Sequence, residues 1–337
     1  MHKKALITGI TGQDGSYLAE LLLDKGYTVF GMVLDMNSLP NITHIKDKLT
    51  LIQGDLRDQE SLDNLIKLSF PDEVYHLASL SFVGTSWKNP VLVADINALG
   101  TARLLESIRK IKPDAKFFHA STSEMFGLTT NIKTEESSFH PKNPYAISKC
   151  YSHWISVNYR ESYNLFISCG ILFNHESPRR GDEFITKKIA NSVALIKKGE
   201  MNFITLGNLD TTRDWGYAKD YVEAMWLMLQ QNKPDDFIIC TSEKHTVRQF
   251  LESAFGAAGI EIESNNKKGV EEEYIRKDNG KVVVKISQEF FRPVELESLS
   301  SDNSKIRTVL KWKPKLKFKD LVRIMVEYEL NKLNGDN

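Results

Sequence analysis

The sequence predicts an α/β protein with a Rossmann-type doubly wound parallel sheet and a smaller C-terminal α/β lobe. Three observations support this fold class. Short apolar runs alternate with amphipathic stretches through the first half of the chain. A glycine-rich turn follows the first apolar run directly, and the pattern becomes less regular after about residue 170.

Six apolar runs have the length and composition of buried strands. Parallel strands need long crossover connections, and the stretches between most of these runs have helical periodicity, so helices are expected on both faces of the sheet. The strands are expected at Lys4–Thr8, Tyr27–Val33, Leu49–Ile52, Glu73–Leu77, Lys116–Ala120 and Leu165–Leu172.

The later part of the chain predicts three helices and one hairpin. The helical patterns cover Ile185–Lys198, Tyr217–Gln230 and Thr246–Ala258. Asp278-Asn279-Gly280 is typical of a hairpin turn. The charged stretch Glu263–Lys281 around this turn fits either a mobile loop or a solvated hairpin.

The composition argues against several classes of protein. Among 337 residues, Lys+Arg and Asp+Glu are both 44, so no bulk charge attracts nucleic acid or an anionic membrane. Cys150, Cys169 and Cys240 form no CxxC pair, which favours reduced thiols in the cytoplasm over a metal site or disulfides. The first strand begins at Lys4, which leaves no room for a signal peptide, and no apolar run approaches a membrane span. We therefore expect a cytoplasmic protein with no metal, no nucleic acid and no membrane partner.

The glycine-rich turn is the first candidate site. Gly9, Gly12 and Gly15, with Thr11, Gln13 and Asp14 between them, connect the first strand to a helix. Glycines are needed there because the turn is tight and the backbone must approach a pyrophosphate held at the helix N-terminus. This context predicts a dinucleotide site.

Two acidic residues are candidates for the adenosine end of a dinucleotide. Asp35 ends the second strand, where a carboxylate binds ribose hydroxyls and repels a 2′-phosphate, which favours NAD and leaves NADP possible. The alternative is a solvated loop aspartate. Asp55 follows the third strand, where either an adenine contact or a simple cap is expected.

Tyr145 and Lys149 form the first catalytic candidate. They lie four residues apart in Asn143-Pro144-Tyr145-Ala146-Ile147-Ser148-Lys149, with Asn143 as N-cap and Pro144 as first helical residue, so they share one helix face. A nearby ammonium and a positive nicotinamide ring are expected to lower the tyrosine pKa from roughly 10 and to make Tyr145 a base. A plain surface pair is the alternative.

Thr122 and Glu124 follow the fifth strand, at the carboxyl edge where open α/β sheets bind ligands. A hydroxyl there can orient a substrate hydroxyl, as in simple dehydrogenases. Those enzymes need no carboxylate two residues later, so Glu124 indicates a second proton transfer at a neighbouring carbon. A solvated loop acid is the competing interpretation.

Long stretches of the chain, above all Ile171-Leu172-Phe173-Asn174-His175-Glu176-Ser177-Pro178-Arg179-Arg180, are too idiosyncratic to match a family by chance. With them the chain resembles the GDP-mannose 4,6-dehydratases of the extended short-chain dehydrogenase/reductase superfamily. The resemblance runs nearly end to end. The other matching segments are Thr8–Glu20, Lys25-Gly26-Tyr27, Pro71–Leu77, Ser121–Gly127, Tyr151–Tyr163, Leu206–Tyr221 and Arg292-Pro293.

The resemblance implies a lyase that converts GDP-mannose, or a close GDP-hexose or GDP-heptose, to the 4-keto-6-deoxy sugar with a recycled NAD(P). Tyr145, helped by Lys149 and Thr122, would take the C4 hydroxyl proton, and Glu124 would take the C5 proton and assist loss of the C6 hydroxyl. Leu56 and Leu77 would contact the cofactor. The implied substrate contacts are Ser81, Asn174, Arg180, Arg213 and Arg292, with Lys188 and Glu295 at the guanosine. Structural salt bridges are the alternative for the arginines.

Departures from the family pattern bear on specificity. Leu34-Asp35-Met36-Asn37 replaces the Arg-Arg-Ser-Ser run of NADP-using members, which supports NAD and makes a homotetramer less certain than a homodimer through the Tyr145–Tyr163 helix. Leu80 and Phe82 replace a usual Gln and His beside the sugar, and Thr212 and Tyr217 replace a usual Lys and His, so a GDP-heptose is a possible substrate.

The change of pattern along the chain divides it into two parts. Residues 1–170 are expected to bind the dinucleotide, with later segments returning to that domain, and residues 171–337 are expected mainly to bind the nucleotide-sugar. Two other functions remain open. A nucleotide-sugar 4-epimerase or 4-dehydrogenase shares Thr122, Tyr145 and Lys149 but has no use for Glu124. A non-catalytic NAD-binding regulator is also compatible with the fold, although such proteins typically lose the Tyr/Lys pair.

Overall fold

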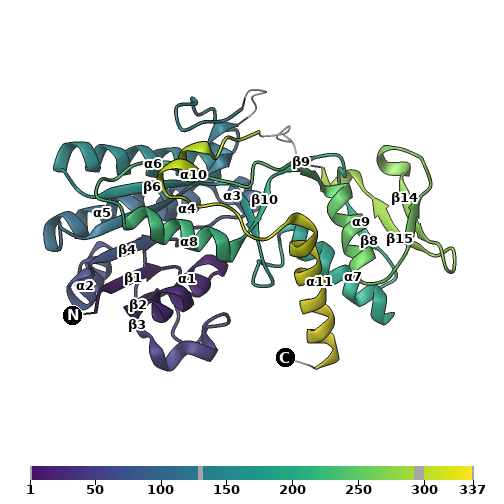
Figure 1. Cartoon of the computed structure of the whole chain (residues 1–337), viewed down its shortest axis with the longest axis horizontal. Helices are drawn as coiled ribbons and strands as arrows, with labels where there is room; N and C mark the ends of the chain where they lie inside the picture. The colour runs from purple at the N-terminus through teal and green to yellow at the C-terminus, as the bar shows by residue number, and fades with distance from the viewer. Residues whose placement is uncertain (1, 128–131, 292–299, 336–337) are drawn as a thin grey trace.

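The computed structural model describes residues 2–127, 132–291 and 300–335, and it contains a large lobe built on a parallel sheet and a smaller lobe beside it (Figure 1). All pairings in the large sheet are parallel, and the strand order is β11-β6-β5-β4-β1-β2-β3. The strands are β1 (Lys4–Thr8), β2 (Thr28–Val33), β3 (Thr50–Gln53), β4 (Glu73–His76), β5 (Lys116–Thr122), β6 (Ile167–Leu172) and β11 (Phe237–Ile239).

The six strands expected from the sequence are confirmed within two residues at each end. The seventh strand, β11, was not predicted, because three apolar residues give too short a signal on their own. It pairs with β6, so a segment from the second half of the chain completes the sheet.

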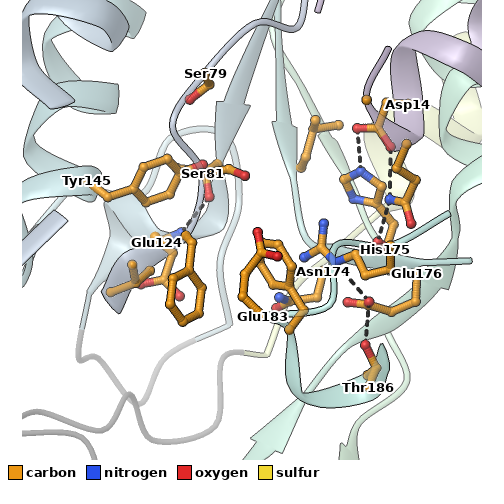
Figure 2. A pocket seen from close by; sticks show the side chains of 18 of the residues that line it. Asp14, Ser79, Ser81, Glu124, Tyr145, Asn174, His175, Glu176, Glu183 and Thr186 are labelled. Atoms are coloured by element: carbon orange, nitrogen blue, oxygen red, sulfur yellow. Dashed lines mark hydrogen bonds and ion pairs between the residues drawn. The ribbon is translucent and has the colours of Figure 1, made fainter. Parts of the chain in front are cut away.

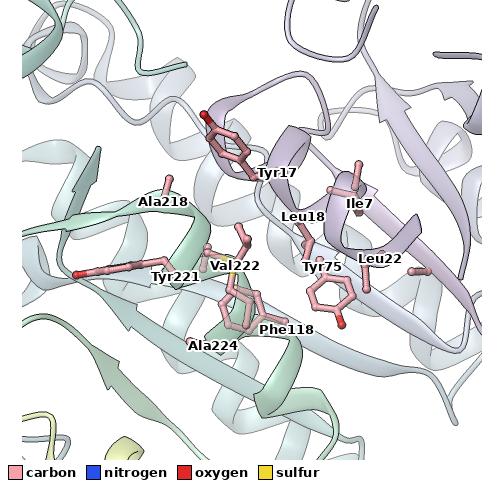
Figure 3. Close-up of a cluster of buried hydrophobic side chains, with 14 of the residues drawn as sticks. Ile7, Tyr17, Leu18, Leu22, Tyr75, Phe118, Ala218, Tyr221, Val222 and Ala224 are labelled. Carbon is pink, nitrogen blue, oxygen red and sulfur yellow. The ribbon is translucent and has the colours of Figure 1, made fainter. Parts of the chain in front are cut away.

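Helices cover both faces of the sheet, as the alternating pattern predicts. One face carries α1 and α8, whose apolar residues pack on β1, β4 and β5 around Leu18, Tyr75 and Val222 (Figure 3). The opposite face carries α2, α5 and α6, which bury Leu62, Leu104 and Val157. The bounds are α1 (Gln13–Asp24), α2 (Gln59–Ser69), α5 (Gly100–Ile111), α6 (Pro144–Tyr163) and α8 (Ala218–Leu229).

The smaller lobe combines four strands with three helices around a separate apolar core that includes Phe250, Phe255 and Val322. The sheet order is β13-β14-β15-β8. The lobe consists of α7 (Ile185–Lys198), β8 (Ile204–Leu206), α9 (Val247–Ala257), β13 (Ile262–Ser264), β14 (Glu273–Arg276), β15 (Val282–Ile286) and α11 (Phe318–Asn334). Of the two structures considered for residues 263–281, the hairpin is the one observed.

The hairpin turns where Asp278-Asn279-Gly280 predicts. β14 and β15 are antiparallel, the Arg276 amide donates to the Lys281 carbonyl at 2.9 Å, and Gly280 has φ +70°. A positive φ is unfavourable for residues with a Cβ, which explains the glycine at this point.

Two small ladders connect the lobes. β7 (Asn174–Glu176) pairs in parallel with β10 (Trp215–Tyr217), and β9 (Thr212–Arg213) pairs with β12 (His245–Thr246). The remaining elements are short: η1 (Thr43–Lys48), α3 (Val83–Lys88), α4 (Pro90–Val93), η2 (Ala94–Leu99), η3 (Ser123–Phe126), η4 (Gly269–Glu271), η5 (Gln288–Phe290) and α10 (Ser304–Val309).

Across the described residues, no helix combines the length and the hydrophobicity that crossing a bilayer requires. The same part of the chain contains no group of three or more His, Cys, Asp or Glu side chains that could hold a metal ion. All three cysteines are free, and Cys169 and Cys240 are buried.

Candidate active site

A cavity of about 790 Å³ opens at the carboxyl ends of the central strands and extends to the second lobe. Tyr145, Ser81 and Glu124 lie on one side of it, and Asn174, His175 and Glu176 on the other (Figure 2). Most of the site residues expected from the sequence line this one cavity. They are Gly9, Thr11, Gly12, Gln13, Asp14, Gly15, Leu77, Ser81, Thr122, Glu124, Tyr145, Lys149, Asn174, Arg180, Lys188 and Arg213.

The glycine-rich turn joins β1 to α1 in a geometry that side chains would destroy. Gly9 has φ +72°, and a Cβ on Gly15 would lie 2.2 Å from the Gly9 carbonyl oxygen. The Gly12 amide closes the turn with a 3.0 Å hydrogen bond to the same oxygen. This tight turn leads into the N-terminus of a twelve-residue helix, an arrangement that fits the pyrophosphate of a dinucleotide.

Tyr145 and Lys149 occupy the first turns of α6, and both side chains are buried against the cavity. Asn143 caps this helix by accepting the Ala146 amide proton at 2.8 Å, and Pro144 is its first residue, as the sequence predicts. The Lys149 ammonium donates to the Ala120 carbonyl oxygen at 2.9 Å, which fixes it at the end of β5. Burial lowers the pKa of Lys149 to about 8.

The groups of the protein alone do not lower the pKa of Tyr145; the expected lowering depends on a bound nicotinamide ring as well as on Lys149. Burial raises the pKa of Tyr145 to about 12, while hydrogen bonding to Thr122 and attraction by Arg180 lower it and the negative charge of Glu124 raises it. The main causes of this shift do not include Lys149, whose ammonium donates to the Ala120 carbonyl. Burial therefore outweighs the neighbouring positive charges in the protein itself.

Glu124 is held by the residue that caps α6. The Asn143 side-chain amide donates to Glu124 Oε2 at 3.0 Å. Thr122, at the end of β5, accepts the Glu124 backbone N–H at 3.3 Å. The carboxylate therefore faces the same cavity as Tyr145 in a fixed position, which is not the arrangement of a solvated loop acid.

The other side of the cavity carries the diphosphate candidates. Arg180 Nε lies 3.0 Å from Glu176 Oε2, and the guanidinium carbon is 3.5 Å from the Phe184 ring centroid. The Thr186 hydroxyl donates to the same Glu176 oxygen at 2.6 Å (Figure 2). Arg180 is thus both ion-paired and part of the cavity lining, so the salt-bridge interpretation and the ligand-binding one are compatible.

Lys188 and Arg213 line the cavity toward the second lobe. Lys188 donates to the Thr205 carbonyl at 2.9 Å and lies over the Phe290 ring, and burial lowers its pKa. Arg213 donates to the Thr212 carbonyl at 2.7 Å. Arg292 and Glu295 lie outside the described residues.

Three predicted cofactor residues are not among the described residues that line the cavity. Asp35 comes two residues after β2 ends, and its carboxylate accepts the Asn37 backbone N–H at 2.8 Å. Asp55 pairs with Arg57 at 2.6 Å, and Asp58 is the residue that caps α2. Leu56 is buried against the helices of the opposite face.

Phe184 and Glu183 line the cavity but were missed by the sequence analysis. Phe184 meets Phe82, which was expected beside the sugar, edge to face with centroids 5.7 Å apart. Leu80, which was expected to flank the sugar beside Phe82, is not among the described residues that line the cavity; its backbone N–H and C=O are both hydrogen-bonded to the Asn97 side chain. Residues 82 and 184 are far apart in the chain, and no local sequence pattern indicates that they are in contact.

The fold and this cavity define a dinucleotide-binding α/β protein of the short-chain dehydrogenase/reductase type. A family model described as GDP-mannose 4,6 dehydratase matches residues 6–325. The chain belongs to the GDP-mannose 4,6-dehydratase family.

Known proteins agree with this assignment. GDP-mannose 4,6 dehydratase 2 of Arabidopsis thaliana is 47% identical over 97% of this chain and 87% of its own length. The human GDP-mannose 4,6 dehydratase is 46% identical over 97% of this chain and 91% of its own. A Thermus thermophilus UDP-glucose 4-epimerase solved with NAD superposes with a TM-score of 0.78 at 27% identity, covering 96% of this chain and 98% of that one. A Bacillus anthracis dTDP-glucose 4,6-dehydratase solved with NAD has the same fold, with a TM-score of 0.80 at 21% identity over 98% and 97% of the two chains.

Proposed function

We propose that this protein is a GDP-sugar 4,6-dehydratase that recycles a bound nicotinamide dinucleotide. The observation that carries the proposal is the joint placement of Thr122, Glu124, Tyr145 and Lys149 in one cavity with the glycine-rich turn. Family membership supports the same activity. The turn fits the dinucleotide, because its glycines line the cavity without side chains and lead into the N-terminus of α1.

The first half of the reaction belongs to Tyr145. A nicotinamide dinucleotide, when bound, accepts a hydride from C4 and later returns it to C6. Tyr145 takes the C4 hydroxyl proton as the C4–H bond breaks, and the product is a 4-keto sugar. Thr122 orients the same hydroxyl, and Lys149 supplies a buried positive charge that favours the phenolate.

The second half belongs to Glu124. The 4-keto group makes the C5 proton acidic, so a carboxylate within reach can remove it. The proton taken by Glu124 then goes to the departing C6 hydroxyl, which leaves as water. C5 then takes a proton from solvent and Tyr145 releases the C4 hydroxyl proton to solvent, so the sum is loss of one water. The hydrogen bond from Asn143 keeps the carboxylate directed at this position.

NAD is the proposed dinucleotide. Asp35 directly follows Met32, Val33 and Leu34, which line the cavity at the end of β2. A carboxylate there disfavours the 2′-phosphate of NADP. Asp55, Leu56 and Leu77 complete the proposed adenosine and nicotinamide contacts.

The sugar diphosphate is proposed to be held by Ser81, Asn174, Arg180 and Arg213, and by Arg292 on the basis of the sequence. The guanosine is proposed to contact Lys188 and Glu295. The aromatic pair Phe82 and Phe184 bounds the cavity on the substrate side. An apolar wall of this kind is compatible with the sugar of GDP-mannose. It is also compatible with a GDP-heptose, whose additional carbon would pack against it.

Substrate identity is testable with a panel. Purified protein is incubated with GDP-mannose, a GDP-heptose and UDP-glucose, without added cofactor, and products are followed by mass spectrometry. Loss of one water from a GDP-sugar, and not from UDP-glucose, supports the proposal and names the sugar. An unchanged mass with inversion at C4 supports a 4-epimerase, and no reaction on any sugar contradicts the proposal.

The other two functions have less support. A 4-epimerase or 4-dehydrogenase gives no role to Glu124, whose carboxylate is held in the cavity by Asn143. A non-catalytic regulator gives no role to the buried pair Tyr145 and Lys149. Both are therefore disfavoured by the same cavity that supports dehydration.

We further propose a homodimer through α6, as the sequence leads us to expect, and we extend the proposed interface to α4 and η2; the homotetramer has less support. These neighbouring helices expose several large apolar side chains: Val91, Leu92, Leu99, Ile147, Tyr151 and Trp154. Exposed apolar surface of this extent is typical of an interface. We also propose that the protein is cytoplasmic, because its three cysteines are free. In this proposal residues 1–170 mainly bind the dinucleotide, and residues 171–337 mainly bind the GDP-sugar.

A further inference from the structure

His175 sits between two hydrogen-bond acceptors. Its Nδ1 lies 2.7 Å from the Phe173 carbonyl oxygen, and its Nε2 lies 2.7 Å from Asp14 Oδ2 (Figure 2). A neutral imidazole has a single N–H and can donate to only one of them. The geometry therefore requires either an imidazolium paired with a carboxylate or a neutral ring beside a protonated Asp14.

The surroundings favour the charged pair. Asp14 Oδ1 accepts a hydrogen bond from Gln13 Nε2 at 3.1 Å, and Asp14 lies in the first turn of α1, where the helix dipole stabilises an anion. Burial lowers the pKa of His175, but the charge and hydrogen bond of Asp14 outweigh it and the net pKa is raised. Arg180 opposes the imidazolium charge from the substrate side, and Tyr221 of α8 stacks on the ring at 4.5 Å.

The position of Asp14 creates an electrostatic problem for ligand binding. It lies two residues after Gly12, in the first turn of α1, and lines the cavity beside the turn that fits a pyrophosphate, so a bare carboxylate there would repel that doubly negative group. His175 comes from β7, a strand 161 residues away in the chain, and acts on this carboxylate more strongly than the second positive group near it, Arg180.

We propose that His175 is a charge-compensating positioning residue whose imidazolium neutralises Asp14 and so permits a pyrophosphate to bind at the glycine-rich turn. The inference rests on the dinucleotide half of the proposed function and is independent of the sugar. His175 also follows Asn174 in β7, so the same contact joins the cofactor turn to the strand that faces the substrate.

The test is a charge-rescue cycle read out as dinucleotide binding. His175→Gln keeps a hydrogen-bond donor for Asp14 but removes the positive charge. We expect its calorimetric Kd for NAD to rise by roughly tenfold or more, since an unpaired carboxylate then faces the pyrophosphate. The double variant Asp14→Asn with His175→Gln is expected to return the Kd to within about threefold of wild type, because both partners are then neutral.

Adenosine, which has no phosphate, is the matched probe. Its Kd, measured by displacement, should differ little between wild type and His175→Gln. Failure of the double variant to restore NAD binding, or an equal loss of adenosine and NAD affinity, would mean that His175 acts through packing and would overturn the proposal. The binding measurements do not depend on dehydration. If no sugar gave a product, the proposed function would fail, but the conclusion about His175 and NAD binding would be unaffected.

A second measurement examines the protonation state directly. In protein labelled with ¹⁵N-histidine, the His175 resonances, assigned by their loss in His175→Gln, should report a proton on both ring nitrogens at neutral pH. A single protonated nitrogen would contradict the imidazolium and with it the proposal.

Discussion

The side-chain amide of Asn143 donates a 3.0 Å hydrogen bond to the Glu124 carboxylate while its carbonyl oxygen caps the helix that carries Tyr145. One side chain thus fixes two candidate catalytic groups from different elements, the loop after β5 and the start of α6. The N-cap is visible in the sequence, but the second contact is not. It makes Asn143 a positioning residue for the proposed C5 proton transfer.

Asn143→Asp separates these two tasks. Aspartate caps a helix as well as asparagine does, so the free energy of unfolding should change little. The donor to Glu124 is lost and a second carboxylate takes its place, so we expect the rate of dehydration to fall by roughly tenfold to a hundredfold. Rapid-quench measurement of product formation, beside denaturant unfolding, checks both expectations. Undiminished dehydration would remove Asn143 from the mechanism.

Lys149 should make the stability of the protein depend on pH. Its pKa falls from 10.5 to about 8 on folding because the ammonium is buried. Between these values the unfolded chain binds more protons, so stability rises as pH increases from 8 to 10.5, and the cost of burying the charge is fully present below pH 8. Lys149→Met should therefore stabilise the fold by roughly 3 kcal/mol below pH 8 and by progressively less up to pH 10.5.

The measurement for Lys149 is the unfolding free energy of both proteins across this pH range. Dehydration by Lys149→Met should be lost at every pH. A stability difference that stays constant with pH would show that the ammonium carries no desolvation cost.

Asp35 should determine the choice of dinucleotide. Asp35→Arg replaces a group that disfavours a 2′-phosphate with one that binds it, so we expect NAD to bind more weakly and NADP more tightly, each on the order of tenfold. Asp35→Asn, which removes the charge alone, is the matched control and should give an intermediate ratio. An unchanged ratio of the two Kd values would mean that Asp35 stays bound to Asn37 and takes no part.

The apolar surface of α4 and α6 should form the dimer. Val91 is 82% exposed, so Val91→Asp should leave the fold intact and weaken dimerisation by at least roughly tenfold, since it buries a charge in an apolar interface. Val270→Asp makes the same change at a residue 54% exposed in the smaller lobe and is the control. Light scattering distinguishes the outcomes. Identical masses for the two variants would place the interface elsewhere.

Local sequence patterns predicted most of the sheet and the catalytic helix because each depends on residues close together in the chain. The glycine-rich turn needs only eight consecutive residues, and the cap and pair in α6 need seven. The approximate ends of β1 to β6 follow from apolar runs in the same way. These signals identified the residues that line one side of the cavity.

The remaining features depend on contacts between distant segments. β11 joins the sheet only because β6 offers it an edge. The pair Phe82 and Phe184 forms because the loop after β4 meets the segment before α7. The raised pKa of Tyr145 in the protein alone could not be predicted, because the sequence shows the nearby lysine but not the burial of Tyr145.

The most direct test of the central claim, that Glu124 performs a second proton transfer after oxidation at C4, is the reaction with GDP-mannose in D₂O, comparing wild type with Glu124→Gln. Nuclear magnetic resonance locates deuterium in the product, and absorbance follows reduction of the bound dinucleotide. The account predicts one deuterium at C5 of a dehydrated product from wild type, and from Glu124→Gln a dinucleotide that is still reduced but little or no dehydration. A product without deuterium at C5, or equal loss of reduction and dehydration in the variant, would contradict it.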